Sequence, residues 1–363
     1  MKETALKSTH VHHRARMVDF AGWEMPVQYT GIREEAAHVR KHAGLFDLGH
    51  MGRVRVKGAQ AEDFLQKLQT NDAAKIPAGA IRYAMILDEN GLTQDDILVY
   101  RHQNSVDFFL VINAGNSERD LGIMRDTASG FDVSVVDQTE ELGMFAIQGP
   151  ASQDIVQKIT DIDLSAIGYY RWTEGDVAGH HVEISRTGYT GEDGFEVYAE
   201  QAKIVELFDA FLNAGKDHEL RPIGLAARDT LRLEAGMPLY GHEIDETTTP
   251  LDAGLDFGVK FTHDFTGRAA LEKIQAAGGP KRRLVGLTTE SRRVPRQGYP
   301  VMSGDNEVGC ILSGAVSPTL DTNIATTYLP HDLAEVGTTV EFAIRDKRES
   351  ATVVHLPFYK RQR

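Results

Sequence analysis

The chain reads Ser-Arg-Thr-Gly-Tyr-Thr-Gly-Glu-Asp-Gly-Phe-Glu-Val-Tyr from Ser185 to Tyr198, with three glycines at a spacing of three. Glycines at this density allow a positive φ or a close approach of the backbone, so we predict a tight loop rather than a helix. From Phe195 onward apolar and polar residues alternate, which predicts a strand. An aromatic ring and the carboxylate of Glu196 would then lie on one side of that strand. Such a pair suits a flat, donor-rich heterocycle, although a purely structural loop would carry glycines too.

Five further motifs lie on either side of this glycine loop. They are Met17-Val-Asp-Phe-Ala-Gly-Trp-Glu-Met-Pro26, Gly44-Leu-Phe-Asp-Leu-Gly-His-Met-Gly52, Asp95-Asp-Ile-Leu-Val-Tyr100, Gly224-Leu-Ala-Ala-Arg-Asp229 and Arg232-Leu-Glu-Ala235. Together, and in this order, the six stretches resemble the T-protein (aminomethyltransferase) family of the glycine cleavage system. The resemblance extends from about Thr4 to Tyr359. Several collinear motifs are more specific than any one of them.

The order of the predicted elements indicates an α+β fold. Hairpins alternate with helices, unlike the regular strand–helix alternation of a parallel sheet. Asn90-Gly91 is a strong hairpin signal between two of the strands. Strands are predicted at 53–56, 81–87, 96–101, 106–112 and 144–148, and helices at 34–42, 59–68, 118–127, 205–212 and 224–236.

A chain of 363 residues is expected to form two or three domains. Residues 276–283 predict a linker, and short strands beyond them predict a small barrel or sandwich. The family resemblance implies three domains in a cloverleaf around a central folate cavity, with a small C-terminal β-barrel domain. We therefore expect a folate-binding region at 1–275 and a barrel at 283–359. Two interleaved α+β domains would form the first region, the hairpin-rich one at about 53–140.

Composition restricts the partners and the compartment. A net charge of −14 disfavours general binding to nucleic acid or to an anionic membrane. No apolar run approaches the ~20 residues that span a bilayer. Cys310 is the only cysteine, which excludes an intramolecular disulfide and fits a reducing compartment. We expect a cytoplasmic monomer, although a mitochondrial protein without its presequence would look much the same.

Common cofactor signatures are missing from the sequence. There is no P-loop, no dinucleotide-binding glycine fingerprint, no His-Glu-x-x-His and no Gly-x-Ser-x-Gly. His10, His12 and His13 lack the spacing of helical metal ligands, and we predict no metal site. The resemblance implies tetrahydrofolate as the acceptor substrate. It also implies a lipoyl arm, supplied by a separate partner, the H-protein, that carries the aminomethyl group.

The resemblance assigns site residues one by one. Asp96 matches the second acid of the family's Asp-Asp pair and is the predicted catalytic carboxylate, with Arg228 beside it as a donor to ligand oxygens or as a residue that orients Asp96. A strand places Asp95 and Asp96 on opposite faces, so we expect Asp95 to be a surface acid. Folate-binding positions are predicted at Met51, Tyr83, Tyr100, Asn113, Tyr170, Tyr189, Glu196, Arg228 and Tyr359. His50 is either a general base or a hydrogen-bonded structural histidine, and Arg186 is expected to pin the glycine loop.

Two alternatives and two departures from the family pattern remain. One alternative is a folate-dependent demethylase acting on a small methylated amine or sulfonium compound. The other is a non-catalytic folate-binding accessory protein, although the cysteine motif of such relatives is absent near residues 235–242. Gly49 stands where the family usually has serine, and Leu92 stands where it tends to have a second glycine, so the mouth of the site is expected to differ.

Overall fold

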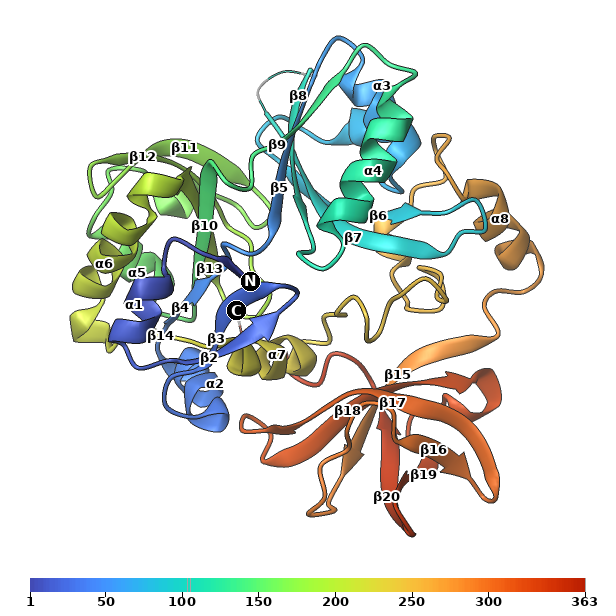
Figure 1. Cartoon of the computed structure of the whole chain (residues 1–363). Coiled ribbons are helices and arrows are strands. Elements are labelled where there is room, and N and C mark those ends of the chain that lie inside the picture. The colour runs from blue at the N-terminus through green and yellow to red at the C-terminus, as the bar shows by residue number, and fades with distance from the viewer. Residues whose placement is uncertain (103, 105, 363) are drawn as a thin grey trace.

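The computed structural model describes residues 1–102, 104 and 106–362. The chain folds into three lobes around a common centre (Figure 1). Two of them are built on β-sheets covered by helices, and the third is a barrel. The predicted α+β class with a C-terminal β-barrel is confirmed.

The first lobe contains a six-stranded sheet in the order β11-β12-β13-β10-β4-β14. Helices α5 (Ser152–Gln157) and α6 (Ile204–Ala214) cover one of its faces. Its strands are β4 (Gly44–Asp47), β10 (Leu142–Gln148), β11 (Trp172–Val177), β12 (His180–Ser185), β13 (Gly194–Glu200) and β14 (Arg221–Pro222). Because β4 precedes the second sheet in the chain and the other strands follow it, the two lobes are interleaved.

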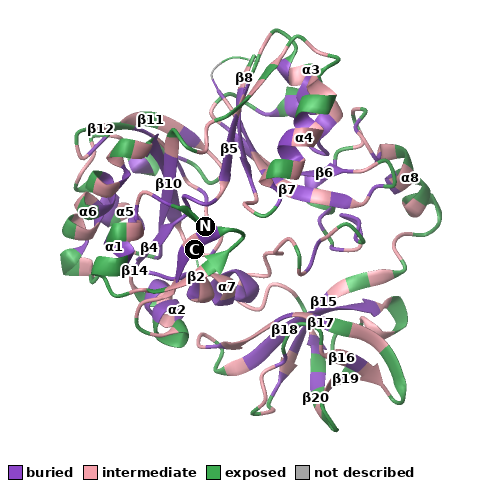
Figure 2. Ribbon diagram, viewed as in Figure 1, coloured by how far each residue is buried: buried purple, intermediate pink, exposed green. Residues whose placement is uncertain are grey.

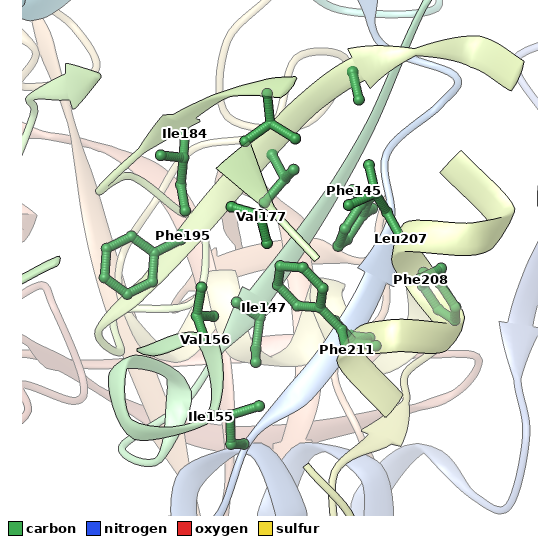
Figure 3. Packing of buried hydrophobic residues seen from close by; sticks show 14 of the residues in the cluster. Phe145, Ile147, Ile155, Val156, Val177, Ile184, Phe195, Leu207, Phe208 and Phe211 are labelled. Atoms are coloured by element: carbon green, nitrogen blue, oxygen red, sulfur yellow. The ribbon is translucent and has the colours of Figure 1, made fainter. Parts of the chain in front are cut away.

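Strand alternation decides which side chains face the helices of this lobe. Phe145 on β10 packs against Phe211 on α6 with ring centroids 4.9 Å apart (Figure 3). Phe195 and Val197 of β13 belong to the same apolar cluster. Since neighbouring residues of a strand point to opposite faces, Glu196 is directed to the other face, toward the centre of the molecule.

The second lobe is a five-stranded sheet in the order β6-β7-β8-β5-β9, packed against α3 (Ala61–Leu68) and α4 (Ser117–Ala128). Its strands are β5 (Gly52–Lys57), β6 (Ile81–Leu87), β7 (Thr93–Arg101), β8 (Asp107–Ile112) and β9 (Ser134–Asp137). The predicted hairpin joins β6 to β7, and Gly91 in its turn has a φ of 78°. Ile97 and Val99 face the helices, whereas Leu98 packs on the central side.

A small sheet near the N-terminus was not predicted. It has the order β1-β3-β2, with β1 (Lys2–Glu3), β2 (Arg16–Phe20) and β3 (Trp23–Gln28). Its hairpin turns at Ala21 and Gly22, both with positive φ. The motif beginning at Met17 therefore forms this hairpin. Helices α1 (Lys7–His12), α2 (Ile32–Lys41) and α7 (Leu225–Glu234) lie nearby, and α2 packs against α7.

The third lobe is a closed barrel in the order β15-β18-β17-β16-β19-β20. Its strands are β15 (Arg282–Thr289), β16 (Pro300–Ser303), β17 (Asn306–Ser317), β18 (Thr322–Pro330), β19 (Thr339–Ile344) and β20 (Lys347–Val354). Helix α8 (Arg268–Ala276) ends just before it, and residues 277–281 form no helix or strand. We propose domain limits of 1–275 and 283–359 on this basis.

Short 3-10 helices complete the described secondary structure. They are η1 (Ala73–Lys75), η2 (Leu164–Ala166), η3 (Gln201–Lys203), η4 (Lys216–His218), η5 (Asp256–Gly258) and η6 (His331–Leu333). Buried residues concentrate along the strands of both sheets and along α7, whereas the outer loops are exposed (Figure 2). The centre of the molecule, where both sheets, α7 and the hairpin β2–β3 meet, is therefore enclosed by rigid elements.

Candidate active site

A cavity of about 1050 Å³ lies at this centre. Both sheets, helix α7 and the hairpin β2–β3 contribute to its wall. It is at the upper end of the size range for small-molecule sites. Eight of the predicted site residues line it, namely Met51, Tyr83, Asp96, Asn113, Tyr170, Tyr189, Glu196 and Arg228.

The carboxylate of Asp96 on β7 is held by one donor at each oxygen. The Tyr83 hydroxyl donates to Oδ2 over 3.0 Å, and Asn113 Nδ2 donates to Oδ1 over 2.8 Å. Burial and the neighbouring charge of Asp95 raise the pKa of Asp96 to about 7, and these two hydrogen bonds oppose the rise. Asp96 is therefore a fixed carboxyl group whose pKa lies close to neutral pH.

The prediction for Asp95 is wrong. The strand does place Asp95 and Asp96 on opposite faces, but Asp95 is fully buried rather than on the surface. Its Oδ1 accepts from Asn116 Nδ2 over 2.6 Å, and its Oδ2 accepts from the backbone N–H of Asn113 over 3.0 Å. The face of β7 that points away from the cavity is covered by α4, so a residue on that face is buried rather than exposed to solvent.

Glu196 faces the cavity from β13 and is held on one oxygen only. Thr187 donates to Oε2, and Tyr100 and Tyr198 lie 3.4 Å from the same atom. No hydrogen bond among the described residues ends on Oε1. Burial raises the pKa of Glu196, and the hydroxyl donors oppose this. Oε1 is thus left for donors of a ligand.

Arg228 on α7 presents a guanidinium group that is not paired. It lies over the ring of Tyr189, 4.4 Å from the centroid, and makes no hydrogen bond or ion pair with another described residue. Burial lowers its pKa. The alternative in which Arg228 orients Asp96 is not supported, because Asp96 is held by Tyr83 and Asn113. Arg228 is instead available to an oxygen of a ligand.

Tyr100 and Tyr359 do not line the cavity, which corrects their predicted positions. Tyr100 is 1% exposed and its hydroxyl lies 2.7 Å from that of Tyr198, behind Glu196. Tyr359 packs under the guanidinium of Arg40 at 4.1 Å. Tyr100 shares its strand face with Asp96, but Phe109 and Tyr198 cover that end of the strand.

The glycine loop has the predicted backbone features. Gly191 has a φ of 78°, and a Cβ on Gly188 or Gly194 would clash with Gln148 or with the carbonyl of Ile147. Arg186 pins the loop, since its Nε donates to Asp193 over 2.9 Å. The loop carries Gly188 and Tyr189 into the cavity wall.

Several residues of the cavity wall were not predicted from the sequence, and His50 was predicted with two alternative roles. His50 is buried, and its Nδ1 has no hydrogen-bond partner in the part of the chain that the structure describes. Burial and the charge of Arg228 lower its pKa to about 3, so it is neutral at pH 7. Phe20 and Arg232 lie within recognised motifs, whereas Phe257, stacked on Tyr83, had no sequence signal.

The two departures from the family pattern lie away from the cavity lining. Leu92 forms part of the β6–β7 turn, where its backbone N–H donates to Asp88, and Gly49 donates to the buried Asp47. Among the described residues, no group of three or more His, Cys, Asp or Glu side chains is placed to hold a metal ion. None of the described helices is long and apolar enough to cross a membrane.

Comparisons with known proteins agree over both parts of the chain. The family model of the GCVT N-terminal domain matches residues 6–263, and that of the glycine cleavage T-protein C-terminal barrel domain matches residues 282–360. An aminomethyltransferase of Geobacillus thermodenitrificans is 45% identical over 364 residues, with 99% of each chain covered. One of Symbiobacterium thermophilum is 46% identical, with 99% of this chain and 98% of the relative covered.

A solved structure gives the same result for the fold. The glycine cleavage system aminomethyltransferase T of Bartonella henselae superposes with a TM-score of 0.92 at 33% identity, covering 99% of this chain and 98% of that one. Fold, cavity and relatives together define a folate-dependent transferase. The chain belongs to the glycine cleavage T-protein family and is an aminomethyltransferase of the glycine cleavage system.

Proposed function

We propose that this aminomethyltransferase moves a methylene group from the aminomethyl-lipoyl arm of H-protein to tetrahydrofolate. The folate loses one proton from N5 and one from N10. One of these protons is transferred to the departing ammonia and the other to the lipoyl sulfur. The carbon exchanges its C–S and C–N bonds for two new C–N bonds, to N5 and N10. The products are 5,10-methylenetetrahydrofolate, ammonia and dihydrolipoyl H-protein. No external oxidant, reductant or metal ion enters this balance.

Asp96 is the residue proposed to handle the protons. The observation that supports this role is its fixed position in the cavity wall together with a pKa near 7. In its ionised form Asp96 accepts a proton from an attacking folate nitrogen and stabilises developing positive charge on the transferred carbon. In its protonated form it returns that proton to a leaving group. One group serves both steps because its two forms are close in free energy at neutral pH.

Glu196 and Arg228 are proposed to bind the substrates. The free Oε1 of Glu196 is suited to the N–H donors of a pterin ring, since an ionised carboxylate only accepts. Arg228 is suited to an oxygen of the folate or of the lipoyl side. Met51, Tyr83, Asn113, Tyr170 and Tyr189 supply the remaining wall. Tyr100 supports Glu196 from behind.

The cellular setting is also part of the proposal. The lipoylated H-protein is the proposed macromolecular partner, and the relatives compared above come from bacteria. A cytoplasmic location is consistent with the single cysteine, Cys310. The protein is proposed to act as a monomer.

Release of ammonia from aminomethylated H-protein, measured with and without tetrahydrofolate, tests the reaction. Dimethylglycine serves as a parallel donor. We expect folate-dependent release from H-protein and none from the small amine. Turnover of dimethylglycine instead would identify a demethylase that uses the same cavity.

Asp96→Asn tests the proton-handling role. We expect tetrahydrofolate binding, measured by calorimetry, within about threefold of wild type, and turnover lower by about 10²–10⁴-fold, the usual contribution of general acid–base catalysis. Glu196→Gln is the matched control on the facing sheet, and it should weaken folate binding more than it slows turnover at saturation. Equal losses of binding and turnover in Asp96→Asn would make Asp96 a binding or folding residue.

A further inference from the structure

A third carboxyl group lies behind Asp96 and Asp95. Asp120, in the first turn of α4, is fully buried. Both of its carboxyl oxygens lack a hydrogen-bond donor among the described residues. Burying an ionised carboxylate without donors is costly, so the group is stable here only as the neutral acid or beside a close cation.

The neighbouring Asp95 has the opposite environment. Its two oxygens accept three hydrogen bonds, from Asn116 Nδ2, from Asn113 Nδ2 and from the Asn113 backbone N–H. All three donors are amide groups that favour an ionised acceptor. The Asp120 carboxyl group is a neighbour of Asp95, and burial together with the charge and contact of Asp95 raises the pKa of Asp120. Two carboxyl groups in contact cannot both be charged in a buried site, and the donors select Asp95 as the charged one.

A cation, Arg119, faces Asp120. Its Nε is 3.9 Å from Asp120 Oδ1, too far for a hydrogen bond. The other nitrogens of Arg119 are engaged by Glu246, by the carbonyl of Gln94 and by the Tyr240 hydroxyl. Burial, and then the charge of Asp95, raise the pKa of Asp120, with Asp96 adding to the effect and Arg119 opposing it.

Asn113 connects this pair to the cavity. Its side-chain Nδ2 lies 2.9 Å from Asp95 Oδ1 and 2.8 Å from Asp96 Oδ1. The orientation of Asn113, and through it that of Asp96, therefore depends on where the Asp95 carboxylate is held. Asp120 faces Asp95 from α4, and a protonated Asp120, whose oxygens have no other hydrogen-bond partner among the described residues, can donate to it.

We propose that Asp120 is a positioning residue that stays protonated and donates its hydroxyl to Asp95, so fixing the Asp95–Asn113 pair that presents Asp96 to the substrates. This inference rests on the proposed role of Asp96 for its effect on turnover. The protonation of Asp120 does not depend on that role. The proton on Asp120 forms a hydrogen bond to Asp95, which then accepts from four donors. The cluster of Asp95, Asp96 and Asp120 therefore carries one negative charge fewer than three ionised carboxylates would.

Infrared spectroscopy of the purified protein tests the protonation state directly. At pH 8, Asp96→Asn should show the carbonyl stretch of a neutral carboxylic acid, and this band should be missing when Asp120→Asn is added to the same variant. A band that is absent from Asp96→Asn, or one that persists in the double variant, would overturn the proposal. Neither result would affect the test of the aminomethyltransferase reaction.

Kinetics of two variants test the positioning role. Asp120→Asn keeps an N–H donor toward Asp95, so turnover should stay within about threefold of wild type and the pH profile should be unchanged. Asp120→Ala removes the donor, and turnover should fall about tenfold or more while the KM for tetrahydrofolate changes little. If Asp120 were instead ionised, Asp120→Asn would remove a negative charge and shift the pH profile to lower pH. If Asp120→Ala does not fold, Asp120→Asn and the infrared spectra still decide the matter.

Discussion

At the scale of single residues, Asp96 carries a cost in stability. Folding raises its pKa from 3.8 to about 7, because burial and Asp95 disfavour the charged form. Between these values the folded protein holds a proton that the unfolded chain has lost. Stability therefore falls as the pH rises through this window, in accord with proton linkage. An active-site group that is destabilising for the fold is a common price of function.

Asp96→Asn is therefore expected to be more stable than wild type at pH 8. The gain should be small near pH 4 and increase up to about pH 7, above which it should level off. Thermal unfolding at several pH values would measure it. A gain that does not vary with pH would show that Asp96 keeps an ordinary pKa in the folded protein.

At the scale of elements, the glycine loop between β12 and β13 is built around Gln148. This side chain is 1% exposed, donates to the carbonyl of Thr187 over 3.0 Å and accepts from Thr190 over 2.8 Å. A Cβ on Gly188 would lie 1.9 Å from Gln148 Oε1. Because Gln148 is enclosed, it cannot move away without losing both hydrogen bonds. The loop and the end of β10 thus fit only with glycine at position 188.

Gly188→Ala should lower stability by about 1–3 kcal/mol, the usual cost of overpacking a closed site. It should also weaken folate binding, since Tyr189 follows it in the cavity wall. Denaturant unfolding and calorimetry would measure the two effects. Gly122→Ala is the control, because Gly122 lies in α4 with nothing within 4 Å of an added Cβ. That change should stabilise the protein by about 0.5–1 kcal/mol.

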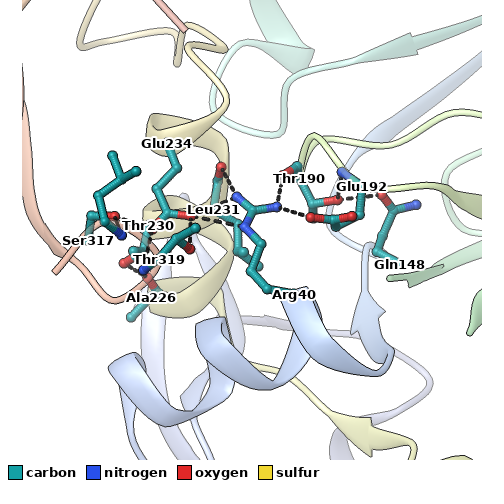
Figure 4. A network of polar contacts seen from close by, with 11 residues as sticks. Arg40, Gln148, Thr190, Glu192, Ala226, Thr230, Leu231, Glu234, Ser317 and Thr319 are labelled. Atoms are coloured by element: carbon teal, nitrogen blue, oxygen red, sulfur yellow. Dashed lines mark hydrogen bonds and ion pairs between the residues drawn. The ribbon is translucent and has the colours of Figure 1, made fainter. Parts of the chain in front are cut away.

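At the scale of the whole molecule, Arg40 on α2 joins the glycine loop, α7 and the barrel (Figure 4). It donates to Glu192 over 2.8 Å and to Glu234 over 2.7 Å, and all three side chains are at least nine-tenths buried. Glu234 accepts in turn from Ser317 and Thr319 of the barrel lobe. The glycine loop of the first lobe, helix α7 and the barrel lobe are thus joined by one buried cation between two carboxylates.

Arg40→Ala should lower stability by roughly 3–5 kcal/mol, because it leaves two buried carboxylates without their cation. Scanning calorimetry and protease resistance of the barrel would follow the loss. Arg33→Ala is a matched control on the same helix, since Arg33 reaches Asp321 of the barrel lobe at 3.7 Å with both side chains mostly exposed. It should leave the unfolding temperature nearly unchanged. Equal losses of stability in the two variants would show that burial of the Arg40 ion pairs does not determine their contribution to stability.

Much of the fold follows from local patterns. The alternation from Phe195 onward predicted the strand β13, the Asn90-Gly91 turn predicted the hairpin β6–β7, and the glycine spacing predicted the loop. The elements that were missed include the hairpin β2–β3 and the strand β18, since the strands predicted in the C-terminal region were 284–289, 307–313, 338–344 and 352–356. Positive φ at the non-glycine Ala21 gives little sequence signal, and no single alternation pattern marks β18, whose residues are buried on both faces.

For the candidate site, the sequence predicted the strand face on which a residue lies but not which residues on that face reach the cavity. Asp96 and Glu196 were placed correctly toward the centre, because the period of a strand fixes the face of each residue. That period does not say how far along the strand the cavity extends, so Tyr100 was expected in the wall although Tyr198 and Phe109 cover it. Nor does it say what packs on the other face, so Asp95 was expected at the surface.

The sequence by itself thus determined many of the elements, the family and the strand faces of Asp96 and Glu196, because these depend on residues near one another in the chain. Only the tertiary structure decided which groups meet. The contacts of Asn113 with both Asp95 and Asp96 and the burial of Arg40 between Glu192 and Glu234 join residues up to 194 positions apart. Such contacts depend on how the three lobes pack against one another. These contacts in turn determine the charge and the pKa of each buried group.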